Sequence, residues 1–139
     1  MTRRQERGSI TVWMATATAA MTLLVGLAVD LGGQVHAQQR AHDLAAQAAR
    51  AGGERIQAAP AIEGEYVRID AVAARNAAAD YLAAAAVDGT VTITGGTTLT
   101  VHVTDTYRPR FLGVIGIGAL SVSGSASARL VRSLGGNER

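Results

Sequence analysis

A long uncharged run dominates the start of the chain. Residues Gly8–Val29 contain no charged side chain, and the run of 22 residues ends at Asp30. At about 1.5 Å per residue, a helix of this length crosses a hydrocarbon layer about 30 Å thick. Basic residues precede the run and an acid follows it, which is the flanking pattern of the positive-inside rule. The sequence therefore predicts a transmembrane helix over 9–29, with the following basic residues at its cytoplasmic boundary: Arg3, Arg4 and Arg7.

This orientation makes residues 1–8 a cytoplasmic basic head. It predicts a single-pass protein of the plasma membrane, with residues 30–134 as an extracytoplasmic domain and 135–139 as a flexible tail. The alternative is a secretory signal cut after Ala37, which would release a soluble binding module beginning at Gln38. The apolar run is longer than the 7 to 15 residues of a typical signal core, and Asp30 lies before that cut, so a retained anchor is favoured.

Small and polar residues form one ridge of the apolar helix. Thr18, Thr22, Gly26 and Asp30 are spaced four residues apart, which places them on one side of the helix. Small residues at this spacing let a second transmembrane helix approach closely. Thr18, Thr22 and Gly26 are therefore candidate helix-packing residues, although threonine and glycine can also simply be tolerated there. Asp30 marks the membrane boundary, and an acid at that position can also be functional.

The helical pattern continues beyond the membrane segment. Good helix formers fill the region from Gln34 to Arg50, where Leu31, Val35, His42, Ala45 and Ala49 mark an approximate face. Gly52–Gly53 is a stop signal, and Pro60 marks the connection to a second predicted helix over 66–86. Apolar residues recur in this second helix at helical spacing, namely Ile69, Val72, Ala79 and Leu82.

The period then changes from helix to strand. Residues 91–94 and 99–104 alternate apolar with polar side chains around Gly95–Gly96, which predicts a hairpin. A glycine-punctuated apolar loop over 111–120 follows Pro109, and alternation resumes over 120–130. Helices followed by strands predict an α+β fold in which a small antiparallel sheet of about three or four strands packs on a helix.

Composition and charge argue against one class of function and indicate how the core is built. The net charge of +2 lies entirely in the first eight residues, and the rest of the chain balances ten arginines against ten acids. A body without a basic stripe, with only 4% aromatic residues, argues against nucleic-acid binding. The chain has no cysteine, and 28 of its 139 residues are alanine, so the core must rely on close approach of helices rather than on bulky side chains.

No constellation predicts catalysis or a bound cofactor. His36 and His42 are six residues apart, on opposite sides of a helix, and His102 alternates with two valines on a strand. Gly113–Gly118 lacks the order of the dinucleotide fingerprint. We therefore expect a structural or interaction protein with no enzymatic activity, no metal and no cofactor. An envelope enzyme using His36 or His102 is a weaker alternative.

Three stretches resemble the TadE/TadG-like pilus-assembly proteins, the minor pilins or pseudopilins of the Tad (Flp) system, in their actinobacterial style. They are Arg7–Trp13, then Val29–Gly33 together with Gln38–Arg50, and finally Pro109–Ala128. The resemblance implies a pilin-like subunit with a long N-terminal helix, whose partners are membrane lipid and other pilin-like or pilus-assembly proteins, in a homo- or hetero-oligomer.

The resemblance also implies prepilin-type cleavage after Gly8, which would leave Ser9 as the new N-terminus. Prepilins usually carry glutamate at the fifth position after the cut, whereas Trp13 occupies it here. A membrane-held accessory subunit is therefore at least as plausible as a pilin packed in a filament.

Overall fold

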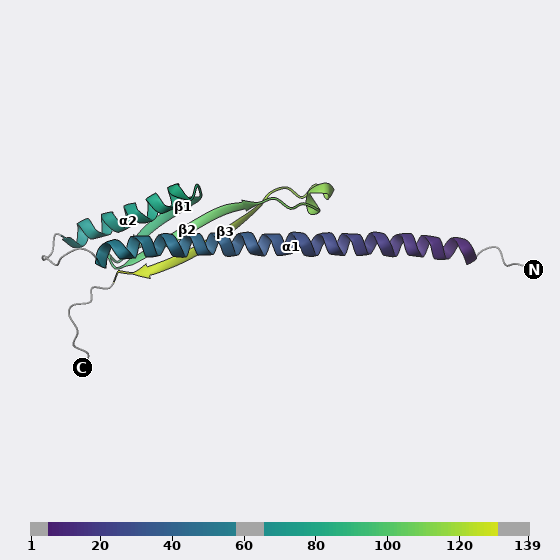
Figure 1. Ribbon diagram of the computed structural model, residues 1–139, viewed down its shortest axis with the longest axis horizontal. Coiled ribbons are helices and arrows are strands. Elements are labelled where there is room, and N and C mark those ends of the chain that lie inside the picture. Colours follow the sequence, from purple (N-terminus) through teal and green to yellow (C-terminus); the bar gives the residue numbers. More distant parts are fainter. Residues whose placement is uncertain (1–5, 58–65, 131–139) are drawn as a thin grey trace, which may run out of the picture. The chain divides into compact units, whose positions relative to one another are not determined.

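The computed structural model describes residues 6–57 and 66–130, with side chains over 9–54 and 71–130. The elements are α1 (Glu6–Gln57), α2 (Tyr66–Ala84), β1 (Asp88–Thr94), β2 (Thr98–Tyr107), a short 3₁₀ helix η1 (Leu112–Ile115) and β3 (Leu120–Arg129) (Figure 1). This order confirms the predicted α+β class with a long N-terminal helix. Arg3, Arg4, Pro60 and the predicted tail over 135–139 lie outside the described residues.

The described chain forms two compact units. The first contains α1 up to Val35 together with Tyr107–Leu120, and the second contains His36–Thr106 together with the chain from Ser121. The two units therefore alternate along the sequence, and each consists of two separate segments. Each unit has its own packing.

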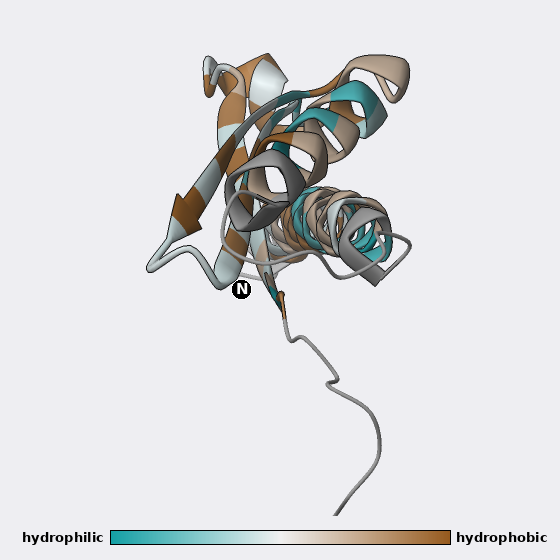
Figure 2. Ribbon diagram, turned by 90° about the vertical axis from the view of Figure 1, so that its left-hand side faces the viewer, coloured by the Kyte–Doolittle hydropathy of each residue, from teal (hydrophilic) through white to brown (hydrophobic). Residues whose placement is uncertain are grey.

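The sheet of the second unit has the strand order β1-β2-β3. β1 and β2 are antiparallel, with Val91 opposite Val101 and Ile93 opposite Leu99, which confirms the predicted hairpin. Gly95 and Gly96 both have positive φ, at 63° and 69°, and glycine adopts this conformation without steric cost. β3 runs antiparallel on the other side of β2, and hydrophobic and polar segments alternate along the strands (Figure 2).

Alanines build the core of the second unit. The buried side chains come from α1, from α2 and from alternate positions of β2, and the cluster consists of Ala41, Ala45, Ala48, Ala49, Ala78, Leu82, Leu99, Val101 and Val103. Leu31, Val35 and His42, which the sequence placed on the same face as Ala45 and Ala49, are exposed. The buried residues of α1 in this unit are therefore its smallest side chains, the alanines, rather than the larger residues of that face.

Two glycines allow this close packing. Gly124 of β3 lies against the backbone of Ala41 and His42, so that no side chain fits between the strand and the helix. Gly52 lies against Leu99 and against the carbonyl oxygen of Ala74. The predicted helix stop at Gly52–Gly53 is therefore wrong: α1 continues to Gln57, and Gly52 serves as a packing position inside the helix.

Candidate functional site

The first part of α1 is an apolar helix whose side chains are largely uncovered. Among them, Val12, Trp13, Met21 and Leu23 are 65 to 71% exposed. α1 is the one helix among the described residues that is long and apolar enough to cross a membrane. Only 6% of its apolar stretch is buried, so this stretch is not the core helix of the described fold.

The threonines of this helix bind its own backbone. The hydroxyls of Thr16, Thr18 and Thr22 donate hydrogen bonds to the carbonyl oxygens of Val12, Met14 and Thr18, over 2.8, 2.8 and 2.9 Å. Each bond spans one helical turn and satisfies a polar group without help from water. Thr18 and Thr22 therefore leave an exposed but hydrogen-bonded ridge on an otherwise apolar surface.

Asp30 ends the apolar segment and is 1% exposed. Its carboxylate accepts three backbone N–H groups: Arg110 donates to Oδ1 over 2.7 Å, Phe111 to Oδ2 over 2.9 Å and Leu112 to Oδ2 over 2.6 Å. The hydroxyl of Tyr107 donates to Oδ1 over a longer 3.4 Å. One buried carboxylate thus holds the returning segment 107–120 against α1.

The returning segment has a local reason to need this acceptor. η1 begins at Leu112, and the first N–H groups of any helical turn lack partners within the turn. Phe111, its N-cap residue, provides no side-chain cap. Asp30 supplies the acceptor from elsewhere in the chain, and a charged acceptor makes stronger hydrogen bonds than a neutral one.

These contacts also set the ionisation of the site. Burial raises the pKa of Asp30, but the hydrogen bonds from Leu112, Arg110, Phe111 and Tyr107 outweigh it and hold the pKa below its ordinary value of 3.8. Burial, and then the neighbouring Asp30 charge, raise the pKa of Tyr107. At neutral pH the site is therefore an ionised carboxylate facing a neutral phenol.

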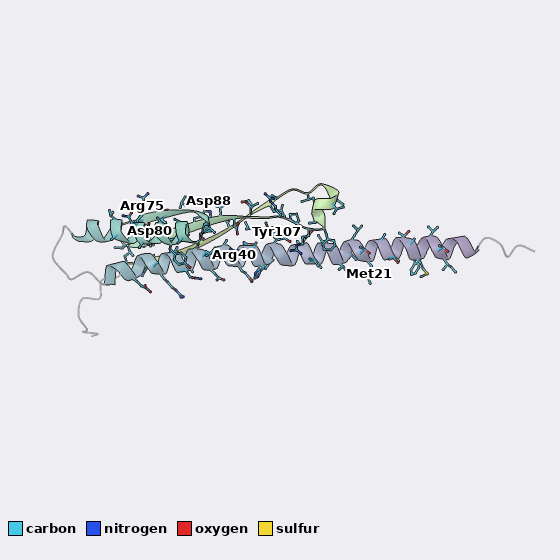
Figure 3. All side chains as sticks on the ribbon, turned by 45° about the horizontal axis from the view of Figure 1, so that its top comes forward. Met21, Arg40, Arg75, Asp80, Asp88 and Tyr107 are labelled. Atoms are coloured by element: carbon cyan, nitrogen blue, oxygen red, sulfur yellow. The ribbon has the colours of Figure 1, made fainter. Side chains whose placement is uncertain are left out.

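Two glycines flank Asp30 on the same side of α1. Gly26 lies four residues before Asp30 and Gly33 lies three residues after it, so the three form one face of the helix. A Cβ on Gly26 would lie 2.9 Å from Cβ and Cγ of Phe111, and one on Gly33 would overlap the Tyr107 ring. Figure 3 shows the Tyr107 side chain beside α1. The two aromatic side chains thus lie over the two glycines, and we call Gly26, Asp30 and Gly33 the docking face.

The sequence pattern placed two residues of this site on one ridge, but for other roles: Gly26 for packing against a second transmembrane helix and Asp30 as a membrane boundary. Gly33, Tyr107 and Phe111 were missed. The available signal was the spacing of glycine, aspartate and glycine at i, i+4 and i+7, combined with two aromatics around Pro109.

The remaining predicted positions lie apart from this site. Arg7, Gly8 and Ser9 belong to the first turns of α1, and Ser9 is exposed. His36, His42 and His102 are also exposed. Over the part of the chain that the structure describes, no three of the residues histidine, cysteine, aspartate and glutamate gather at metal-binding distance.

Fold and site together define a class of protein: a small α+β protein on a long, exposed, apolar N-terminal helix, with a returning segment fastened to that helix by a buried carboxylate. Residues 8–59 match the family described as "Putative Flp pilus-assembly TadE/G-like". The match confirms the predicted resemblance and contains the docking face, whereas the aromatic residues that cover it lie beyond residue 59. No curated protein and no solved structure matches the chain.

Proposed function

We propose that the chain is a single-pass membrane subunit of a Tad (Flp) pilus-assembly system, a minor pilin or pseudopilin that acts through protein contacts and not through catalysis. The observation that carries the proposal is the family match over 8–59, because it contains the whole apolar segment. The large exposed apolar surface of that segment supports placement in lipid, since such a surface is unfavourable in water. Residues 1–8 then face the cytoplasm by the positive-inside rule.

The ridge on the apolar helix supports a role in helix packing. Phe111 covers Gly26, so the part of the ridge open to another helix consists of Thr18 and Thr22. Their hydroxyls already bind backbone carbonyls, which leaves a small surface for close approach. The proposed partners are transmembrane helices of other pilin-like or pilus-assembly subunits, or of a second copy of this chain.

The docking face favours an anchor over the secreted alternative. Cleavage after Ala37 would remove Gly26, Asp30 and Gly33 together, and the backbone N–H groups at 110–112 would lose their acceptor. A buried donor without an acceptor is costly, so a released module beginning at Gln38 would have to rearrange its 107–120 segment.

Two measurements on native membranes test the proposal. We expect the full chain to stay with the membrane after an alkaline carbonate wash, and mass spectrometry to find a mature N-terminus at or before Ser9. An N-terminus at Ser9 would identify prepilin-type cleavage after Gly8. Full extraction by carbonate, or a species beginning at Gln38, would refute the anchor.

Cysteine crosslinking tests the packing surface, and the absence of native cysteines makes single-cysteine variants unambiguous. We expect Thr18→Cys and Thr22→Cys to crosslink to partner helices in the membrane. Ala20→Cys is the matched control because it lies on the other side of the same exposed helix. Equal yields from all three positions would contradict a specific helix-packing ridge.

A further inference from the structure

The segment that docks on Asp30 carries an exposed apolar loop. We define the apolar loop as residues 111–119, which contain η1 and three glycines. Its large side chains are exposed to different extents: Val114 is 86% exposed, Ile115 62% and Ile117 40%, and Phe111, which packs on Gly26, is still 48% exposed. Such a cluster at the tip of a loop is unfavourable in water and indicates a surface that something covers.

The docking contact fixes where this loop lies along α1. Phe111 packs on Gly26, which is four residues closer to the N-terminus than Asp30. Four residues of helix correspond to about 6 Å along the axis. If residues 9–29 lie in hydrocarbon, the start of the apolar loop is therefore level with the last turn of the membrane segment. Interfacial elements commonly bury their apolar side chains 5 to 10 Å into this zone.

Six N–H groups between residues 110 and 117 also meet the condition that lipid imposes on a polypeptide backbone. Irregular backbone is costly at membrane depth unless its N–H groups have partners. Asp30 accepts the N–H groups of residues 110–112. Loop carbonyls accept those of Val114, Gly116 and Ile117 over 3.0 to 3.2 Å. This need explains why a charged acceptor is placed at the end of an apolar helix.

The charged side chains beside the apolar loop indicate which kind of lipid headgroup it contacts. Arg108 and Arg110 are both exposed and flank Pro109 at the point where the segment reaches Asp30. Asp30 is occupied by backbone N–H groups and by the Tyr107 hydroxyl. Guanidinium groups at the membrane surface bind phosphate well, and basic residues there favour anionic lipid.

We propose that the apolar loop is a second membrane contact, inserted into the outer leaflet beside α1, with Arg108 and Arg110 on anionic lipid phosphates. This inference rests on the proposed membrane anchor. The chain then meets the bilayer at two places, and Asp30 sets the depth of the second one.

Depth-dependent fluorescence quenching tests the insertion. The full chain carries one tryptophan, so Trp13→Phe provides a background for three single-tryptophan variants, Val114→Trp, Met21→Trp and Thr97→Trp. Each is reconstituted in vesicles of phosphatidylcholine and phosphatidylglycerol with brominated acyl chains. Val114 and Thr97 are both exposed, in the apolar loop and in the hairpin turn, so both substitutions should fold. We expect quenching at 114 and 21 and none at 97.

The other outcomes are each decisive. Quenching at 21 but not at 114 overturns the inserted loop and leaves the anchor intact. No quenching at either position refutes the anchor on which the inference rests. Blue-shifted emission at 114 without quenching means that protein, such as a second copy of this chain, covers the loop, and it overturns the lipid assignment.

The dependence of quenching on lipid charge tests the proposed contact of Arg108 and Arg110 with lipid phosphates. We expect quenching at 114 to be stronger with phosphatidylglycerol than in pure phosphatidylcholine, and the double substitution Arg108→Gln, Arg110→Gln to remove that difference. Arg75→Gln, an exposed arginine of α2, is the control and should preserve it. Equal quenching in both lipids, or a difference that survives the double substitution, would overturn the phosphate contact.

Discussion

Phe111 packs directly on Gly26, with its Cβ and Cγ only 2.9 Å from the position that a Cβ on Gly26 would take. These are the atoms of Phe111 nearest its backbone, so the ring cannot simply turn away. The contact therefore depends on the absence of a side chain at residue 26. It also ties the position of the returning segment to a single residue of α1.

Gly26→Ala should displace segment 107–120 from α1. We expect a cost of about 1–3 kcal/mol to docking, because an added methyl group overpacks a close contact. Hydrogen exchange of the amides at 110–112 in detergent micelles measures it. Gly32→Ala is the matched control, since a Cβ there meets nothing within 4 Å, and it should leave the exchange unchanged. Equal exchange in both variants would contradict the Gly26 contact.

Asp30→Asn should release the same segment. The amide keeps the size of the side chain but has one carbonyl oxygen in place of the two carboxylate oxygens that accept N–H groups. We expect amide exchange at Arg110, Phe111 and Leu112 to approach that of unprotected amides, while β1 and β2 keep their protection. Asp43→Asn, an exposed acid of the same helix, is the control. Retained protection in Asp30→Asn would show that the charge is not needed.

Docking of the segment should weaken in acid. The pKa of Asp30 is below 3.8 while the segment is docked and returns toward 3.8 when it is released. A lowered pKa stabilises the docked state above the ordinary value, and that stabilisation disappears as pH falls through the lowered pKa. Protection factors of the amides at 110–112 should therefore be constant from pH 7 to about 5 and fall below about 4. Asp30→Asn should remove this dependence, and a fall already near pH 6 would contradict it.

Gly124→Ala should destabilise the second unit. A methyl group on Gly124 would overlap the backbone of Ala41 and His42, which cannot give way without moving α1. We expect a loss of about 1–3 kcal/mol in the free energy of unfolding, measured by urea denaturation. Gly53→Ala is the control, because a Cβ there would reach only an ordinary contact of 3.8 Å with Ala128. That variant should be neutral or slightly more stable, since alanine favours a helix over glycine.

The sequence predicted the elements better than their contacts. Gly95–Gly96 between alternating runs specified the hairpin, because two positive φ angles and a period of two are local properties. The buried face of α1 was harder to predict because alanine occurs on several sides of the helix. Which alanines are buried depends on where Gly52 and Gly124 permit close approach, and this is a property of the packed fold.

The contacts of the docking face were also harder to predict than the helix that carries it. Asp30 was recognisable as the acid that ends the apolar run, but its donors are backbone groups, which leave no mark in a sequence. They also lie 80 to 82 residues away, so no local pattern connects them to Asp30. Gly33 was not predicted to belong to a site, whereas it provides space for Tyr107.

The sequence separation between Asp30 and its donors has a consequence for biosynthesis. The carboxylate leaves the ribosome 80 residues before the amide of Arg110, which at 5–20 residues per second is an interval of about 4–16 seconds. The carboxylate of Asp30 therefore has no backbone donors from 110–112 during this interval, and the docking of 107–120 is a late step of folding.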